Sequence, residues 1–268
     1  MNIVVCIKQV PDTTDVKIDS ETNTLIREGV EAVINPFDMY AIEEGVRIRE
    51  RFGGKVTAIT MGPPQAQDVL KEAISMGVDE GIHLCDKVFA GSDTWSTSLI
   101  LAKALEKICD SSTSATDLVI CGKQASDGDT AQVGPGIASH LNLPQATYVR
   151  RIDTVHMDTC PRIIVVERLL EEGYELLELQ LPALITVVKE INEPRLPSLR
   201  GKMRARTAKI PVWTNSDLGI DEDQIGLGGS PTQVVKIFTP PQKGGGQIFK
   251  GDPEEVVSRL VEEIKDLF

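Results

Sequence analysis

The sequence lacks long hydrophobic runs, paired cysteines and a basic, apolar N-terminal segment, and each absence excludes a class of protein. No apolar stretch approaches the roughly 18–20 residues that a membrane-spanning helix requires. The N-terminus begins with a strand-like run and shows no secretory signal pattern. The five cysteines are odd in number and widely spaced, which suits neither a disulfide framework nor a CxxC metal site. We therefore expect a cytoplasmic protein with no membrane span and no bound metal.

Positive charge and the residue patterns of common enzymes are also scarce. With 28 Lys and Arg against 40 Asp and Glu, the net charge is −12, which argues against a nucleic-acid-binding protein. There is no P-loop, no GxSxG motif and no metal-spaced histidine pair. Gly134 and Gly136 begin a GxGxxG pattern, but Ser139 stands where its third glycine belongs. We expect no acid–base or nucleophilic catalytic residue in this chain.

The first half of the sequence alternates between strand-like and helix-like segments. Apolar β-rich runs cover residues 2–10, 55–61, 81–85 and 117–121. Helical patterns between them begin near Pro36, which follows Asn35 as a predicted N-cap, and near Pro63 and Thr94. This alternation predicts an α/β fold with a parallel sheet covered on both faces. Ligands bind beyond the carboxyl ends of such strands, which places residues 6–8, 60–62 and 122–124 at one rim.

The second half is expected to add further strands and an extended arm. Strand patterns cover residues 146–156, 162–169, 174–181 and 184–189, with a hairpin turn at Glu171-Glu172-Gly173. Residues 230–250 are rich in proline and glycine, which predicts an extended conformation. The chain ends in an amphipathic helix, for which Asp252 is the expected N-cap and Glu255 the expected partner in a capping box. Such an arm needs another surface to pack against.

The loop 122–134 is the most informative segment for function. It follows a predicted strand and leads into a predicted helix after Thr130, so its backbone N–H groups suit a phosphate or pyrophosphate. Gly128 allows unusual backbone angles. Asp127 and Asp129 would cap the helix or bind ribose hydroxyls. From the residues alone, a solvated turn with an aspartate N-cap is an equally good interpretation.

Several segments resemble the beta (small) subunits of electron-transfer flavoproteins. Residues 122–134 resemble the nucleotide-binding loop of that family. A second, independent match follows the family's signature spacing at Val166-Glu167-Arg168, Glu171-Glu172-Gly173, Glu175, Leu177, Pro182 and Leu184-Ile185-Thr186. Residues 35–38, 61–63 and 192–195 also fall at family positions. The resemblance covers essentially the whole chain.

The resemblance implies a fold, a division of the chain and a set of binding residues. The fold is a Rossmann-like parallel sheet of the adenine-nucleotide-binding (alpha-hydrolase-like) superfamily, with added antiparallel strands and an extended C-terminal arm. Residues 1–228 would form the nucleotide- or flavin-binding domain, and residues 229–268 would pack on an obligate alpha subunit. The cofactor-binding residues implied by family position are Cys6, Ile7, Asn35, Pro36, Phe37, Asp38, Met61, Gly62, Thr94, Gly122, Lys123, Gln124, Asp127, Gly128, Asp129, Thr130, Ala131, Gln132, Val133 and Gly134.

Two branches of the family differ in the cofactor of the beta subunit. In one branch it holds structural AMP, and the protein shuttles electrons from acyl-CoA dehydrogenases. In the other it holds FAD, which takes electrons from NADH and divides them between ferredoxin or flavodoxin and an acyl-CoA dehydrogenase. That dehydrogenase works as an enoyl-CoA reductase of the crotonyl-, acryloyl- or caffeyl-CoA class. The electron-bifurcating branch is the one that this sequence resembles more closely, at residues 91–94, 127–135, 230–232 and 240–241. FAD and NADH are therefore expected, with AMP and simple shuttling as the alternative.

Residues 192–209 form a basic segment in this acidic chain, with only Glu193 against six Lys and Arg. A solvated basic turn would account for this charge. The segment also resembles the family's recognition loop, in which a leucine inserts into a pocket on the client dehydrogenase. An apolar anchor surrounded by charges suits such docking. The partner-binding residues expected on this basis are Leu199, Arg195, Arg200 and Lys202.

A non-redox adenine-nucleotide-binding protein is a more distant alternative. ATP-splitting ligases of the same superfamily carry an SGGxDS-like phosphate loop after the first strand. This chain has Lys8-Gln9-Val10-Pro11-Asp12 at that position. Stress-type modules would lack the signature spacing of residues 166–186 and the long arm.

Overall fold

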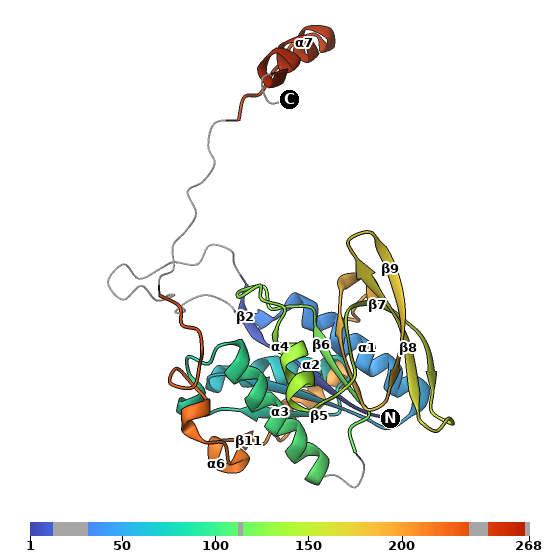
Figure 1. Ribbon diagram of the computed structural model, residues 1–268, viewed down its shortest axis with the longest axis vertical. Coiled ribbons are helices and arrows are strands. Elements are labelled where there is room, and N and C mark those ends of the chain that lie inside the picture. Colours follow the sequence, from blue (N-terminus) through green and yellow to red (C-terminus); the bar gives the residue numbers. More distant parts are fainter. Residues whose placement is uncertain (13–31, 112–114, 236–245, 266–268) are drawn as a thin grey trace.

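The computed structural model, which describes residues 1–12, 32–111, 115–235 and 246–265, contains a large sheet with helices on both faces (Figure 1). Within these residues, nine strands form the sheet in the order β11-β5-β4-β1-β6-β10-β7-β8-β9. The strands are β1 (Asn2–Cys6), β4 (Lys55–Met61), β5 (Glu80–Leu84), β6 (Leu118–Gly122), β7 (Gln145–His156), β8 (Ile163–Leu170), β9 (Gly173–Gln180), β10 (Ala183–Val187) and β11 (Val212–Trp213). A separate pair joins β2 (Gln9–Pro11) antiparallel to β3 (Ala32–Ile34).

The apolar runs of the sequence form the parallel part of the sheet. β1 pairs in parallel with β4 and β6, and β10 pairs in parallel with β6 and β7. β7, β8 and β9 continue the sheet as antiparallel strands, with the β8–β9 turn at Glu171 and Glu172 as predicted. The α/β class with added antiparallel strands is therefore confirmed. β11, which extends the sheet beside β5, was not predicted.

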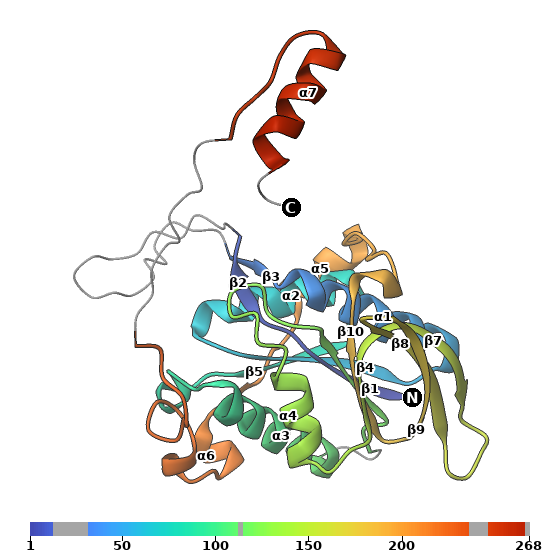
Figure 2. The same ribbon diagram turned by 45° about the horizontal axis from the view of Figure 1, so that its top comes forward.

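The helices lie in two layers (Figure 2). Figure 2 shows α1, α2 and α5 on one side of the sheet and α3, α4 and α6 on the other. The helices are α1 (Pro36–Phe52), α2 (Gln67–Met76), α3 (Thr94–Ser111), α4 (Val133–His140), α5 (Leu199–Thr207), α6 (Asn215–Leu218) and α7 (Pro253–Ile264), and the short 3-10 helices are η1 (Pro64–Ala66), η2 (Lys87–Phe89), η3 (Lys189–Ile191) and η4 (Glu222–Gln224).

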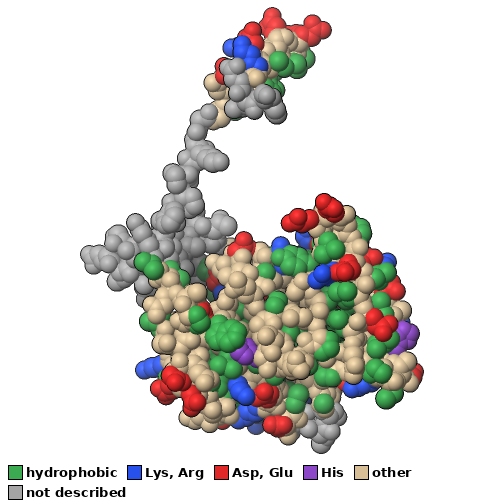
Figure 3. Space-filling view, in the orientation of Figure 1, with side chains coloured by type: hydrophobic (Ala, Val, Ile, Leu, Met, Phe, Trp, Pro, Cys, Tyr) green, Lys and Arg blue, Asp and Glu red, His purple; other side chains and the backbone are tan. Residues whose placement is uncertain are grey.

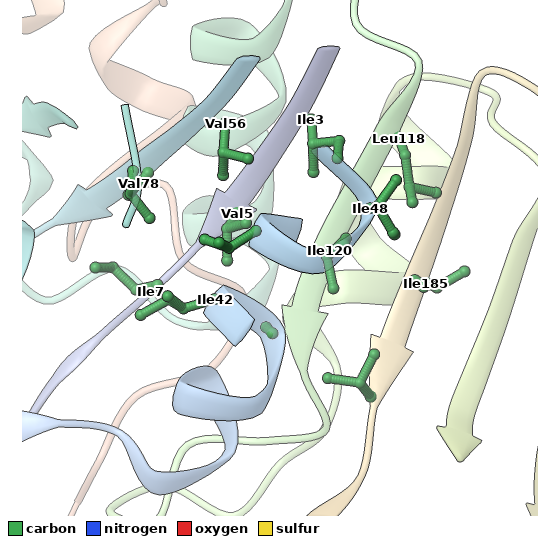
Figure 4. Packing of buried hydrophobic residues seen from close by; sticks show 14 of the residues in the cluster. Ile3, Val5, Ile7, Ile42, Ile48, Val56, Val78, Leu118, Ile120 and Ile185 are labelled. Carbon is green, nitrogen blue, oxygen red and sulfur yellow. The ribbon is translucent and has the colours of Figure 1, made fainter. Parts of the chain in front are cut away.

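Alternate residues of the central strand β1 pack into different layers because successive side chains of a strand point to opposite faces. Ile3 and Val5 belong to the core beneath α1 and α2, whereas Val4 and Cys6 belong to the core beneath α3 and α4. Figure 4 shows Ile42 of α1 close to Val5. Each such aliphatic side chain contributes about 1.5–3 kcal/mol on full burial, so the two cores hold the strands and helices in place.

Residues 192–209, expected as a loop, contain helix α5, and this expectation was wrong. Ser198 caps the helix, because its Oγ accepts a hydrogen bond from the Gly201 N–H at 2.9 Å. A Cβ on Gly201 would overlap the Ser75 carbonyl oxygen of α2, so only glycine permits this close packing. Arg204 Nη2 donates to the carbonyl oxygens of Ile74 and Val78 at 2.9 and 2.6 Å. Contacts with a distant helix therefore stabilise α5.

The beginning of the predicted arm is attached to the body of the protein. Ser230 Oγ accepts a hydrogen bond from the Asp93 N–H at 2.8 Å. The Thr232 N–H and Oγ1 both donate to Asp93 Oδ2, at 2.9 and 2.7 Å. Pro240 and Pro241, which contributed to the resemblance, lie outside the described residues.

The C-terminal helix α7 begins where the sequence predicts and is amphipathic. Asp252 caps it by accepting from the Glu254 N–H at 3.0 Å, one residue before the expected capping-box partner. Val257, Leu260 and Val261 are all exposed. In the part of the chain that the structure describes, no helix is both long and apolar enough to cross a membrane.

Candidate functional site

A cavity of about 500 Å³ lies at the carboxyl ends of β1, β4 and β6, at the predicted rim of the sheet. This volume is typical of small-molecule and cofactor sites. Most of the residues predicted to bind the cofactor line it: Cys6, Ile7, Asn35, Asp38, Met61, Thr94, Gly122, Lys123, Gln124, Gly128, Thr130, Ala131, Gln132, Val133 and Gly134.

Five residues predicted for the site do not line the cavity, and eight others do. Those outside the lining are Pro36, Phe37, Gly62, Asp127 and Asp129. The additional lining residues are Lys8, Ser92, Asp93, Thr97, Leu101, Cys121, Ala125 and Val234. Thr97 and Leu101 follow Thr94 at helical spacing, so the periodicity of α3 could have identified them. Val234 has no local signal, because it belongs to the arm segment that Asp93 anchors.

Asn35 stands at the N-cap position of α1, but its side chain holds the 122–134 loop instead of capping the helix. Its Nδ2 donates to the Gln124 carbonyl oxygen at 2.8 Å and to Asp38 Oδ1 at 2.9 Å. Its Oδ1 accepts from the Ser126 N–H at 3.0 Å. The predicted side-chain cap was wrong because these longer-range partners occupy the amide.

Asp38 connects three segments of the cavity wall. Its Oδ2 accepts from the Lys8 N–H at 2.7 Å, and its carboxylate also accepts from Asn35 and from the Gly122 N–H. Burial raises the pKa of Asp38 to about 7, although these hydrogen bonds act in the opposite direction. The carboxyl group therefore fixes the exits of β1 and β6 against the start of α1.

Glycine is required at the end of β6 for a similar reason. A Cβ on Gly122 would overlap Asp38 Oδ1 and lie 2.7 Å from the carbonyl carbon of Phe37. A Cβ on Gly134 would lie 2.6 Å from Thr186 Cγ2, where α4 packs on β10. These two glycines let the loop pass close to its neighbours and shape the cavity.

Unusual backbone angles do occur in this loop, but at residues other than Gly128, which would allow them. Asp129 and Ala131 have positive φ angles of 51° and 55°, whereas the φ of Gly128 is not positive. A Cβ added to Gly128 would have no atom within 4 Å. Left-handed non-glycine residues are uncommon and cluster at binding sites. The strain of this loop therefore lies at Asp129 and Ala131.

The two aspartates of the loop do not cap the following helix, contrary to one of the two expectations for them. Asp127 forms an ion pair with Lys8 Nζ at 2.6 Å, and Asp129 Oδ1 accepts from Gln124 Nε2. The N-cap of α4 is Gln132. Lys8 therefore compensates the charge of Asp127, whereas Asp129 is held by a neutral amide and keeps its negative charge.

The N-termini of α3 and α4 both meet the cavity and are joined to each other. Thr94 Oγ1 donates to Gln132 Oε1 at 2.8 Å. The backbone N–H groups of Thr130, Ala131 and Gln132 have no hydrogen-bond partner among the described residues. Unpaired N–H groups at a helix N-terminus attract anions. The lining therefore fits a phosphate or pyrophosphate group, as the sequence predicts.

Two thiols and one histidine support the walls of the cavity. Cys6 and Cys121 are register partners on β1 and β6. A hydrogen bond with Cys6, together with burial, raises the pKa of Cys121, which keeps it a neutral thiol. His83 is buried, its pKa is lowered by that burial, and its Nε2 lies 3.1 Å from the Gly62 carbonyl oxygen. The two thiols line the cavity, whereas His83 lies outside the lining, next to Gly62.

The basic segment divides into cations that are paired and cations that are exposed. Arg195 binds Glu43 Oε2 through Nε at 2.7 Å and Glu50 Oε1 through Nη1 at 2.6 Å. Arg200 and Lys202 are exposed, and 79% of the Leu199 surface is accessible. The structure thus leaves three of the four predicted partner-binding residues on the surface and places Arg195 in an internal network. On the face drawn in Figure 3, acidic and basic side chains are interspersed.

Comparison with known proteins identifies relatives along the whole chain. The electron transfer flavoprotein domain model matches residues 22–218. The electron transfer flavoprotein subunit beta of Thermoanaerobacterium thermosaccharolyticum is 51% identical over 265 residues, covering 98% of each chain. Subunit CarD of the caffeyl-CoA reductase–Etf complex of Acetobacterium woodii is 46% identical, covering 99% of this chain and 98% of its own. Protein FixA of Azotobacter vinelandii is 47% identical, covering 90% of this chain and 84% of its own.

Proposed function

Because the chain belongs to the electron transfer flavoprotein family, as a beta subunit that pairs with an alpha subunit, we propose that its cavity holds FAD and serves electron bifurcation in the cytoplasm. The observation that carries this proposal is the cavity itself. Residues 130–132, whose N–H groups have no partner among the described residues, line it just before α4, where the pyrophosphate would bind. The bound flavin would supply the redox chemistry, and the chain supplies binding and orientation.

Each part of the lining has a separate task in this proposal. The 122–134 loop would contact the pyrophosphate, and Thr130 and Gln132 add uncharged hydrogen-bonding groups. Asn35 and Asp38 would hold that loop without donating to the ligand, because their polar atoms already bind the chain. The buried thiols of Cys6 and Cys121 give the inner wall an apolar character.

The electron donor and acceptors follow from the bifurcating branch. NADH would reduce the flavin of this cavity, one electron would pass to ferredoxin or flavodoxin, and the other would pass through the alpha-subunit FAD. The final acceptor would be an acyl-CoA dehydrogenase working as an enoyl-CoA reductase. The resemblance to CarD supports this choice, since that protein's name places it in a caffeyl-CoA reductase–Etf complex.

Two surfaces would carry the protein contacts. Residues 229–268 would form the arm that packs on the alpha subunit, with the apolar side chains of Val257, Leu260 and Val261 buried there. Residues 1–228 would form the cofactor-binding domain. Leu199, flanked by the exposed Arg200 and Lys202, would insert into the client dehydrogenase, and Arg195 would fix the base of this segment through Glu43.

An anaerobic titration of the purified heterodimer with NADH tests the proposal. Bleaching of flavin absorbance, followed by ferredoxin reduction that depends on an enoyl-CoA and its reductase, is the expected result. A heterodimer whose flavin is not reduced by NADH, but is reduced by an acyl-CoA dehydrogenase with its substrate, would be a simple electron shuttle. That outcome would support the AMP-containing alternative for this cavity.

A further inference from the structure

Lys123 lines the cavity, and its ammonium group contacts two aromatic rings that lie outside the lining. Its Nζ lies 5.5 Å from the ring centroid of Phe37 and 5.2 Å from that of Tyr148, both within cation–π range. Its backbone N–H donates to the Val187 carbonyl oxygen at 2.8 Å, which fixes the residue at the exit of β6. The ammonium group is thus held between rings that do not cancel its charge.

The other charged groups of the lining are already satisfied within the chain. Lys8 donates to both carboxylate oxygens of Asp127, at 2.6 and 2.7 Å. The Asp93 carboxylate accepts hydrogen bonds from Ser96 and Thr232. Asp38 accepts from backbone and amide N–H groups and forms no direct ion pair with another described residue. Bringing an anion next to these carboxylates is unfavourable unless a cation compensates it.

No carboxylate among the described residues pairs with Lys123, so it is the lining cation that remains available. One of the two aromatic residues that contact Lys123 has a strained backbone conformation. Tyr148 has a φ of 59°, an uncommon conformation for an aromatic residue, and its N–H donates to Thr186 Oγ1 at 3.1 Å. Such strain persists where the surrounding structure fixes it, commonly at binding sites.

We infer that Lys123, held between Phe37 and Tyr148, is the side chain that neutralises the phosphate of the bound adenine nucleotide. This inference rests on the proposed nucleotide-binding function and adds a side-chain cation to the backbone N–H groups of residues 130–132. It also gives a role to Phe37, which lies outside the cavity lining: Phe37 orients the lysine and does not touch the ligand. Tyr148 is likewise a positioning residue, on a strand that the sequence did not connect with the site.

Comparing AMP with adenosine tests the inference, because only AMP carries the phosphate. The heterodimer is freed of nucleotide on this chain, and binding of both probes is measured by equilibrium dialysis. Lys123→Met should weaken AMP binding about tenfold or more, the loss of one charge-assisted hydrogen bond, and leave adenosine binding unchanged. The salt dependence of AMP binding should fall as well, because a charge pair is lost. Lys123→Arg should retain most of the preference for AMP.

Two further variants separate the role of the rings from a loss of folding. Tyr148→Gly keeps the positive φ but removes the ring, and should weaken AMP binding by a smaller factor than Lys123→Met. Tyr148→Phe keeps the ring and should bind AMP as the wild type does. Lys103→Met, at an exposed lysine of α3 paired with Glu106, is the matched control for loss of a surface charge and should change neither probe.

The outcomes distinguish this inference from the function on which it rests. An unchanged ratio of AMP to adenosine affinity in Lys123→Met would overturn the inference alone and leave phosphate binding to the backbone. Equal losses for both probes would also overturn it, because they would indicate a distorted cavity. A wild-type protein that binds neither AMP nor FAD on this chain would overturn the proposed function and the inference together.

Discussion

Helix α1 buries two carboxylates whose surroundings shift their pKa values in opposite directions. Asp38, at the cavity, accepts hydrogen bonds from backbone and amide groups, and burial raises its pKa to about 7. Glu43 faces residues 192–209. Burial would also raise its pKa, but hydrogen bonds from the guanidinium groups of Arg195 and Arg47 outweigh that effect and lower it.

The difference lies in the partner, since 5% of the Asp38 surface and 2% of the Glu43 surface are exposed. Peptide and amide dipoles orient Asp38 without compensating its buried charge, whereas guanidinium groups compensate Glu43. At neutral pH the buried charge of Asp38 therefore destabilises the cavity end of α1. Near Glu43, the ion pairs with Arg195 and Arg47 stabilise the helix. Cofactor sites commonly carry such perturbed groups, while an ion pair of this kind fixes a surface segment in place.

The largest expected effect concerns the pH dependence of stability at Asp38. A carboxyl group whose folded pKa is raised contributes stability below its ordinary pKa of 3.8, and this contribution is lost as pH rises towards about 7. Over that window the loss is on the order of 4 kcal/mol. Asp38→Asn should remove this part of the slope when unfolding free energy is measured against pH. Identical slopes in the two proteins would contradict the assignment.

Glu43 should show the opposite sign. Its lowered pKa means that its stabilising contribution is present above the ordinary value of 4.5 and is lost as pH falls below that range. Arg195→Met leaves this buried carboxylate with Arg47 alone and should cost about 2–4 kcal/mol in chemical denaturation at neutral pH. Arg200→Met, at an exposed arginine of the same segment, is the control and should stay within about 0.5 kcal/mol. Equal costs in the two variants would show that Arg195 does not compensate the buried Glu43 carboxylate.

Two glycines of the cavity loop provide a smaller, sterically defined contrast. Gly122→Ala places a methyl group against Asp38 and Phe37 and should destabilise the protein by about 1–3 kcal/mol, with loss of bound nucleotide. Gly128→Ala meets nothing within 4 Å and should leave the melting temperature close to that of the wild type. A reversed order of the two melting temperatures would mean that the loop takes another path.

The smallest effect on stability is expected at Leu199. Leu199→Ala should leave folding and cofactor content unchanged, because the side chain is exposed. Binding to the client dehydrogenase should weaken by about 1–2 kcal/mol, measured as slower electron exchange at limiting dehydrogenase concentration. Leu196→Ala is the matched control, since Leu196 is exposed on the same segment. A loss in Leu196→Ala as large as that in Leu199→Ala would assign docking to the whole segment instead of to one anchor.

The parallel half of the fold was predictable because its strands are buried on both faces. Such strands appear as continuous apolar runs, of which residues 55–61 and 117–121 are examples. The positions of Asn35 and the 122–134 loop relative to these runs predicted the rim of the sheet at which the cavity lies. α5 was not predictable in this way, because its position depends on contacts of Gly201 and Arg204 with α2.

The ion-pair partners of charged residues could not be predicted from the sequence either. Asp127 finds Lys8 across 119 positions of the chain, and Arg195 finds Glu43 across 152. A residue type does not fix its backbone angle either, since Asp129 adopts a positive φ although the neighbouring Gly128 would allow one more easily. Sequence patterns record local periodicity and turn chemistry, whereas these features are decided by which segments meet in the folded chain.

The most direct test of the central claim is the nucleotide content of the heterodimer after co-expression with its alpha subunit. The account predicts two FAD per heterodimer, one of them released from this chain by Gly122→Ala. One FAD and one AMP would contradict the flavin assignment and make the protein a simple shuttle. One FAD with no second adenine nucleotide would contradict the assignment of the cavity as a nucleotide site.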